Sequence, residues 1–225
     1  MVVSTNMKRL GIASAILLAA CLASTQYAAG ATRSTRSSCA PAGSRVLAAD
    51  AHVLVYSKVE VVGRYHEKGT RIHGCAYGHR SYLLGTLPTC QGAGPCGGPE
   101  HEVLAGPLVA YEESGGGTVT RIYRVVVRNL RTGQTIRDAP TGNLGTPSKS
   151  FVGVGPTTSI VVKNDGAVAW IVEAGFPTTY QVHAVDKNGS RLVASGSDID
   201  PSSLALAAET IYWTAGSTAM SAPLN

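Results

Sequence analysis

The segment Gly166-Ala167-Val168-Ala169-Trp170 is a run of small and β-branched residues that ends on a large aromatic. Similar segments end on Tyr56, Tyr111 and Trp213, at intervals of roughly 50 residues. Another strand-like run precedes each segment through a short turn, which predicts four β-hairpins. Hairpins repeated at this spacing indicate a fold assembled from copies of one sheet-forming unit.

A second hairpin follows the first in three of the four units. The runs 72–75 and 82–85 superpose without a gap on 182–185 and 192–195. The segments between such runs carry Asn, Asp and Gly, which favour tight turns. Each unit is therefore predicted to be a four-stranded meander, and the fourth copy, which ends at Asn225, lacks its outermost strand.

A four-stranded unit repeated at this length resembles a β-propeller blade. The phrase Asn129-Leu130-Arg131-Thr132-Gly133-Gln134 is similar to the turn between the two outer strands of many blades, and the resemblance covers residues 44–225. The chain as a whole looks like exported, uncharacterised bacterial β-propeller-like proteins. The resemblance implies an all-β, β-propeller-like fold of about four degenerate four-stranded units, with no established activity.

Two architectures remain open at this point. Residues 33–43 are candidates to complete the fourth blade, with Cys39 holding the added strand, and this would allow a closed four-bladed ring. The alternative is an open β-meander or sandwich, whose edge strands need protection.

The first 31 residues have the pattern of an export signal. Lys8 and Arg9 precede an apolar run over residues 10–23. This run is too short to cross a bilayer as a helix, which takes about 20 residues. Ala29-Gly30-Ala31 predicts cleavage before Thr32, whereas Leu18-Ala19-Ala20-Cys21 resembles a lipobox and predicts lipidation of Cys21. We expect a secreted or extracytoplasmic protein, bound to the membrane only if Cys21 is lipidated.

This pattern divides the chain into three parts. Residues 1–31 form the export signal peptide, residues 32–44 an N-terminal segment, and residues 45–225 the β-propeller-like domain.

Four cysteines remain after the leader: Cys39, Cys75, Cys90 and Cys96. An even number in an oxidising compartment predicts two disulfides, with three ways of pairing. Cys90 and Cys96 flank the flexible run Gln-Gly-Ala-Gly-Pro and are the first choice of pair. Cys39 with Cys75 follows by elimination.

The charge balance argues against a nucleic-acid partner. The chain has 19 Lys and Arg against 14 Asp and Glu, and two of the basic residues belong to the leader. The one basic concentration is expected to divide between two faces of a strand pair. It consists of Arg121, Arg124, Arg128, Arg131 and Arg137.

Ordinary structural roles account better than metal binding for the His, Cys and Asp groups of the sequence. The cluster His66, His73, Cys75 and His79 has residue types that bind zinc, but export should oxidise Cys75. The pairs His66-Glu67 and His101-Glu102 lack the second His of a zinc-protease helix. The loop from Asp186 lacks a Glu at its twelfth position, and Asp198 and Asp200 are expected to be solvated or to cap a turn.

No catalytic, cofactor-binding or metal-binding residue is therefore assigned, and no cofactor is expected. Tyr56, Tyr111, Trp170 and Trp213 occupy one repeat position and are predicted to form a core aromatic layer. We expect a monomeric, exported, non-catalytic binding or cell-envelope module for an unknown protein or glycan ligand. The alternatives are a hydrolase or lyase type of enzyme with its site at the central mouth, and a lipid-anchored structural lipoprotein.

Overall fold

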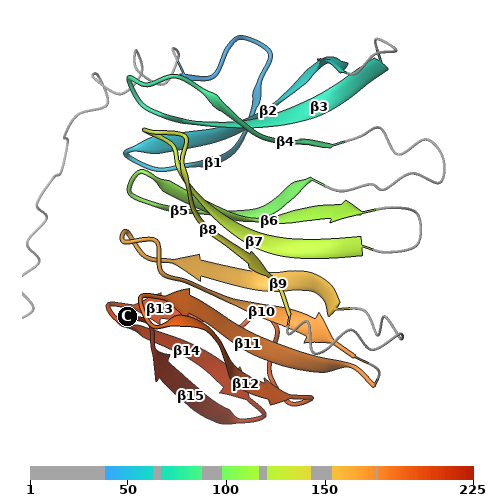
Figure 1. The fold of residues 1–225 in the computed structure, drawn as a ribbon, viewed down its shortest axis with the longest axis vertical. Helices are drawn as coiled ribbons and strands as arrows, with labels where there is room; N and C mark the ends of the chain where they lie inside the picture. Colours follow the sequence, from blue (N-terminus) through green and yellow to red (C-terminus); the bar gives the residue numbers. More distant parts are fainter. Residues whose placement is uncertain (1–38, 63–66, 88–97, 117–120, 143–153, 176) are drawn as a thin grey trace, which may run out of the picture.

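Figure 1 shows the computed structural model, in which four antiparallel sheets are stacked along the long axis of the molecule. The structure describes residues 39–62, 67–87, 98–116, 121–142, 154–175 and 177–225. The all-β, propeller-like prediction is confirmed, because every sheet is a meander of strands adjacent in the sequence.

The first two sheets have four strands each. The first contains, in spatial order, β1 (Arg45–Ala49), β2 (Val53–Val62), β3 (Glu67–Ala76) and β4 (Tyr82–Leu87). The second contains β5 (Pro99–Ala105), β6 (Leu108–Gly116), β7 (Arg121–Asn129) and β8 (Thr135–Pro140).

The third sheet repeats this pattern and the fourth is shorter. The third contains β9 (Val154–Val162), β10 (Val168–Ala174), β11 (Thr179–Asp186) and β12 (Gly189–Gly196). The fourth contains β13 (Ala205–Ala207), β14 (Thr210–Ala215) and β15 (Thr218–Pro223), so within the described ranges it has three strands where the others have four.

One β-bulge recurs where the third strand of each complete sheet pairs with the fourth. The register shifts between Ile72 and His73 in the first sheet, and between Val182 and His183 in the third. The corresponding shift in the second sheet lies between Val127 and Arg128. A bulge adds local twist and re-aims the side chains beside it, so its repetition marks the units as structural copies.

Neighbouring sheets share apolar layers because side chains alternate between the two faces of a strand. Val55 and Ile72 of the first sheet pack with Val109 of the second. Val127 of the second sheet packs with Trp170 of the third. The layer between the third and fourth sheets is built from Ile171, Val182, Ile211, Trp213, Leu224 and their neighbours.

The stack is open, with the first and fourth sheets at its two ends (Figure 1). The suggestion that residues 33–43 complete the fourth sheet is wrong for the described part of that segment. Cys39 is bonded to Cys75 of β3 and packs against Leu54 and Tyr56, so the segment covers the outer face of the first sheet. Among the described residues the four sheets do not close into a ring, an arrangement consistent both with propeller-like units and with the open alternative.

Candidate functional site

The four repeat aromatics are all buried. Tyr56, Tyr111, Trp170 and Trp213 are exposed by 3%, 2%, 0% and 4%. Each side chain packs against the part of the molecule that comes immediately before its own sheet in the sequence. Tyr56 contacts the Cys39 segment, and the other three pack against the preceding sheet.

Tyr111 is displaced from the position of Tyr56 and Trp170. In the first and third sheets the residue after the bulge is a histidine that lies opposite the aromatic: His73 faces Tyr56, and His183 faces Trp170. In the second sheet the residue after the bulge is Arg128, and it lies opposite Val109. Tyr111 therefore lies two residues further along its strand. It keeps the same face because the side-chain period of a strand is two.

Trp170 and His183 form a stacked pair inside the third sheet. Their ring centroids lie 5.5 Å apart with an angle of 11° between the planes. The Trp170 Nε1 donates to the carbonyl of Thr141 in the second sheet at 2.5 Å, and His183 Nε2 lies 2.8 Å from Gln181 Oε1. Burial lowers the pKa of His183 to about 4, so the ring is neutral at neutral pH.

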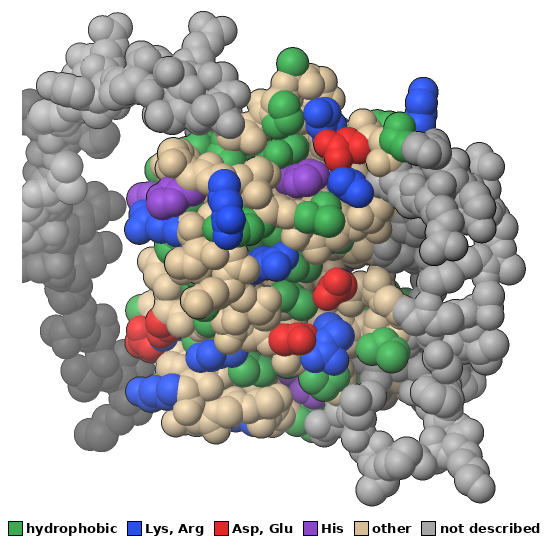
Figure 2. Space-filling view, turned by 45° about the horizontal axis from the view of Figure 1, so that its top comes forward, with side chains coloured by type: hydrophobic (Ala, Val, Ile, Leu, Met, Phe, Trp, Pro, Cys, Tyr) green, Lys and Arg blue, Asp and Glu red, His purple; other side chains and the backbone are tan. Residues whose placement is uncertain are grey.

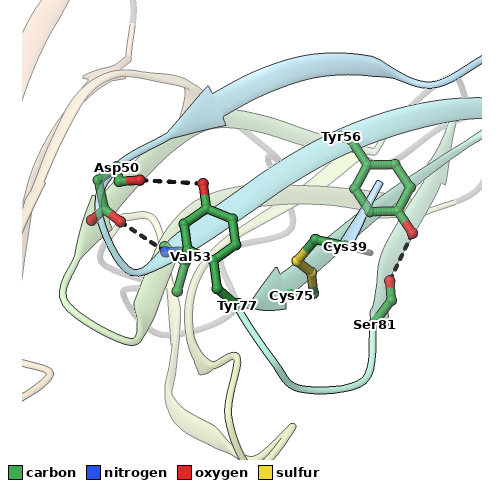
Figure 3. The surroundings of a disulfide bond; sticks show 7 residues. All are labelled: Cys39, Asp50, Val53, Tyr56, Cys75, Tyr77 and Ser81. Atoms are coloured by element: carbon green, nitrogen blue, oxygen red, sulfur yellow. Dashed lines mark hydrogen bonds between the residues drawn. A yellow bond between two sulfur atoms is a disulfide. The ribbon is translucent and has the colours of Figure 1, made fainter. Parts of the chain in front are cut away.

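A disulfide fixes the covering of the first sheet, as Figure 3 shows. Cys39 and Cys75 lie with their Cα atoms 6.0 Å apart, within the usual range for a disulfide. Beside them the Tyr56 hydroxyl lies 2.8 Å from Ser81 Oγ. The ring of His73, opposite Tyr56 on β3, stacks on the Tyr56 ring with centroids 5.3 Å apart.

Several sequence-based assignments fall outside the described residues. The residues outside the described ranges include Cys90, Cys96, Cys21, the rest of the leader and His66. Within the described ranges, no group of three or more His, Cys, Asp or Glu side chains is arranged to hold a metal ion.

Asp186 joins the β11–β12 turn to the C-terminal residue Asn225. It is buried and accepts hydrogen bonds from the N–H groups of Asn188 and Asn225, at 2.8 Å and 2.9 Å. Arg191 approaches to 2.8 Å. Burial alone raises the pKa of Asp186, but these donors outweigh it and lower the pKa below its usual value. The exposed Asp200 accepts from Ser202 and caps its turn.

The arginines of the second sheet are divided between its faces. Arg124 pairs with Asp138 at 2.5 Å, and Arg128 donates to the carbonyl of Leu83 in the first sheet at 2.7 Å. Arg137 lies opposite Val127, whose side chain faces the third sheet. Figure 2 shows acidic and basic side chains interspersed on the visible face, with no large patch of one sign.

A hollow lies where turns of the second, third and fourth sheets meet. A pocket of about 410 Å³ is formed by Ala105, Val162, Lys163, Asn164, Asp165, Leu206, Ala208 and Glu209. Its walls include the β9–β10 and β13–β14 turns, because successive hairpins turn at the same edge of the stack (Figure 1). Ala208 has a φ of 49°, in the left-handed region that non-glycine residues rarely adopt.

Lys163 is the fixed charge at the base of this pocket. Its side chain is 10% exposed, and its ammonium group contacts Glu209, Asp165 Oδ2 at 3.1 Å and the Leu224 carbonyl at 3.0 Å. The hydrogen bond to Glu209 raises the pKa of Lys163, which keeps the ammonium group protonated. The carboxylates of Asp165 and Glu209 are 55% and 67% exposed and face solvent around it.

A second polar group lies at a bulge in β5. The register with β6 shifts between Glu100 and Val103, and His101 has a φ of 58°. Backbone strain of this kind is frequent at functional sites. Burial raises the pKa of the neighbouring Glu102 above its usual value.

Glu112 of β6 lies next to this polar group on the neighbouring strand, and its side chain is buried. It is 1% exposed, lies opposite Glu100 and accepts a hydrogen bond from the Thr157 N–H of the third sheet. Burial raises the pKa of Glu112, while the hydrogen bonds from Thr157 oppose the rise. Glu102 and Glu112 are thus carboxyl groups biased toward protonation beside an imidazole, the residue types of general acid and base catalysis.

The sequence reasoning did not single out Glu112, Lys163, Asp165 or Glu209. One signal was available for Glu112, because it shares the alternating face of Leu108 and Ala110. A charged residue at a core position of a predicted strand indicates a buried polar contact. The pocket gave no such signal, because its walls come from three separate sheets.

Comparison with family models, curated proteins and solved structures gives no match to this chain. In the part of the chain that the structure describes, no helix has the length and apolarity that crossing a bilayer requires.

Proposed function

We propose that this chain is an exported, non-catalytic binding module of the cell envelope, and that its ligand is a protein bearing an exposed basic side chain. The pocket formed by three sheets around Lys163 carries this proposal. A recognition site needs concave shape and fixed polar groups, and this pocket has both.

The charges of the pocket favour a cationic group. Lys163 is already paired with both Asp165 and Glu209, whose side chains nevertheless stay 55% and 67% exposed. Two carboxylates around one ammonium group leave a net negative rim on a chain whose overall formal charge is +5. A Lys or Arg side chain of a partner complements this rim.

A protein ligand is favoured over a glycan. Sugar-binding surfaces commonly use exposed aromatic rings as stacking platforms. Here the four repeat aromatics are exposed by no more than 4% and are occupied by packing contacts. The Cys39–Cys75 disulfide is typical of proteins that fold in an oxidising compartment, which supports the exported location.

The test uses peptides that differ only in charge. A short peptide with one Arg is titrated into isotopically labelled protein, and we expect amide shifts in residues 163–165 and 206–209. Replacing the Arg with Gln should abolish these shifts, as should Glu209→Gln in the protein. Glu113→Gln is the matched control, because Glu113 is an exposed carboxylate outside the pocket. Equal binding of the Arg and Gln peptides would contradict the proposal.

A second candidate function rests on the β5 bulge. The strained His101 beside Glu102 and Glu112 favours acid and base chemistry of a hydrolase or lyase type. A panel of chromogenic esters, glycosides and phosphates tests it. This candidate requires turnover that is lost in Glu102→Gln and retained in Glu113→Gln.

A further inference from the structure

The outer edge of the fourth sheet differs from that of every other sheet. In the first three sheets the third strand, β3, β7 or β11, is paired on its outer side by a fourth strand. In the fourth sheet β15 takes the place of that third strand, and among the described residues β14 is its one neighbour in the sheet. β15 is therefore an edge strand in a position that is covered in its three structural copies.

The register of β15 identifies the backbone groups that point outward. Residues of an antiparallel strand alternate between bonding their neighbour and facing away from it. Pro223 lies opposite Thr210 but has no N–H, and its carbonyl accepts from Arg191 of β12 at 2.6 Å. Pro223 therefore belongs to the outward set, and so do Ala219 and Ser221, which precede it by four and two residues.

The chemistry of this edge does not prevent pairing. Natural edge strands are commonly protected by lysine, by inward-pointing charge or by bulges. β15 contains no charged residue, its register with β14 is regular, and five of its six residues are exposed. Arg191 and Pro223 close one end of the edge. Within the described ranges, the outward N–H and C=O groups of Ala219 and Ser221 pair with no other strand and can accept an added one.

The same strand in a second copy of the chain fits this edge. We propose that two copies pair through β15, antiparallel and around a two-fold axis at Met220, to form one six-stranded sheet. In this register Ala219 lies opposite Ser221 of the other copy, so both outward N–H groups and both outward carbonyls of each copy are bonded.

The edge is complementary to itself, because the outward groups of Ala219 and Ser221 exchange hydrogen bonds with the same groups of a second copy. Copies of a chain with a formal charge of +5 repel each other, and this repulsion is least where they meet at a neutral surface. The strand is neutral, and the pairing sets Arg191, beside Pro223, against the uncharged turn Gly216–Ser217 of the other copy. The proposed dimer differs from the monomer expected from the sequence and does not depend on the pocket around Lys163.

The first test measures mass in solution by sedimentation equilibrium over a wide range of protein concentration. We expect the mass to rise to twice that of the monomer. Ser221→Pro removes an outward N–H and leaves the bonds to β14 intact, so this variant should stay monomeric with an unchanged urea midpoint. Tyr212→Lys places a charge on the exposed face of the central strand β14, opposite Ser221 but one strand inside the edge, where it removes no outward backbone group; this variant should still form dimers.

The second test reads the register directly. Met220→Cys places two thiols opposite each other across the two-fold axis and should form an intermolecular disulfide under mild oxidation. Ala222→Cys is the matched control, because residue 222 lies opposite residue 218 of the other copy and not opposite itself. A monomer at every concentration, a dimer lost in Tyr212→Lys but kept in Ser221→Pro, or equal cross-linking of both cysteine variants would overturn the proposal.

Discussion

His183 is 3% exposed beneath Trp170, and this burial lowers its pKa from 6.5 to about 4. The unfolded chain therefore takes up a proton at a higher pH than the folded protein does. Because the unfolded state then binds more protons, the free energy of unfolding decreases as the pH falls from about 6.5 towards 4. We expect His183 to account for a loss of about 3 kcal/mol between pH 7 and pH 4.

Urea unfolding at both pH values checks this prediction. His183→Phe keeps a ring to stack on Trp170 and removes the titration, so its stability should change less with pH. Buried carboxylates such as Asp186 contribute to both proteins and cancel in the comparison. The same pH dependence in both proteins would show that His183 is not responsible.

Trp170 joins two sheets through its packing and its indole N–H. It is 0% exposed in the layer between the second and third sheets and donates to the Thr141 carbonyl. Trp170→Ala should lower the free energy of unfolding by about 3–5 kcal/mol. Tyr212→Ala is the control, because its side chain is 43% exposed and its loss should change stability by less than about 0.5 kcal/mol. Equal losses in the two variants would contradict the interlayer role.

At the scale of the strands and turns, a comparison of two glycines distinguishes the cost of backbone strain from the cost of a steric clash. Gly78 and Gly133 have φ values of 80° and 79°, so alanine is strained at both positions. A Cβ at position 78 meets nothing within 4 Å, whereas one at position 133 lies 2.2 Å from the ring of Tyr82. Gly133 therefore allows the β7–β8 turn to lie directly against the first sheet.

We expect Gly78→Ala to cost about 1–2 kcal/mol from backbone strain alone. Gly133→Ala should cost more, because Tyr82 must also move and its hydrogen bond to the Arg131 carbonyl is then lost. The difference between the two urea midpoints measures the steric part. Equal costs would mean that Tyr82 moves aside freely.

Across the whole molecule, the disulfide stabilises one end of an open stack. It closes a loop with a sequence separation of 36 residues, which corresponds to about 3–4 kcal/mol of unfolded-chain entropy. Replacing Cys39 and Cys75 with Ala should lower the free energy of unfolding by that amount. Because layered repeats contact mainly their neighbours, hydrogen exchange should rise first in β1–β4. A uniform rise over all four sheets would contradict this local effect.

The repeat was visible in the sequence because strand alternation and turn chemistry are local. The segment Gly166–Trp170 and each of its copies predict a hairpin from local sequence alone, and the repetition of these hairpins predicts a stack of sheets. Ring closure was not visible in this way, because it depends on the small rotation between sheets, summed over the stack. No single residue encodes that rotation.

The candidate sites show the same division. Cys39 and Cys75 were paired by elimination, and nothing local indicated that their bond covers the face of the first sheet that bears Tyr56. The neighbours of Lys163 are equally remote, since Glu209 lies 46 residues away.

The sequence by itself determined the all-β class, the four units, the missing strand of the last unit and the four aromatics that recur in them. These properties depend on contacts between residues close in the chain, where side-chain alternation and turn residues act directly. Only the tertiary structure decided that the stack is open, that Tyr111 is shifted by two residues, and which charges meet at the pocket. Those properties depend on packing between sheets, where apolar layers of similar composition fit together in more than one arrangement.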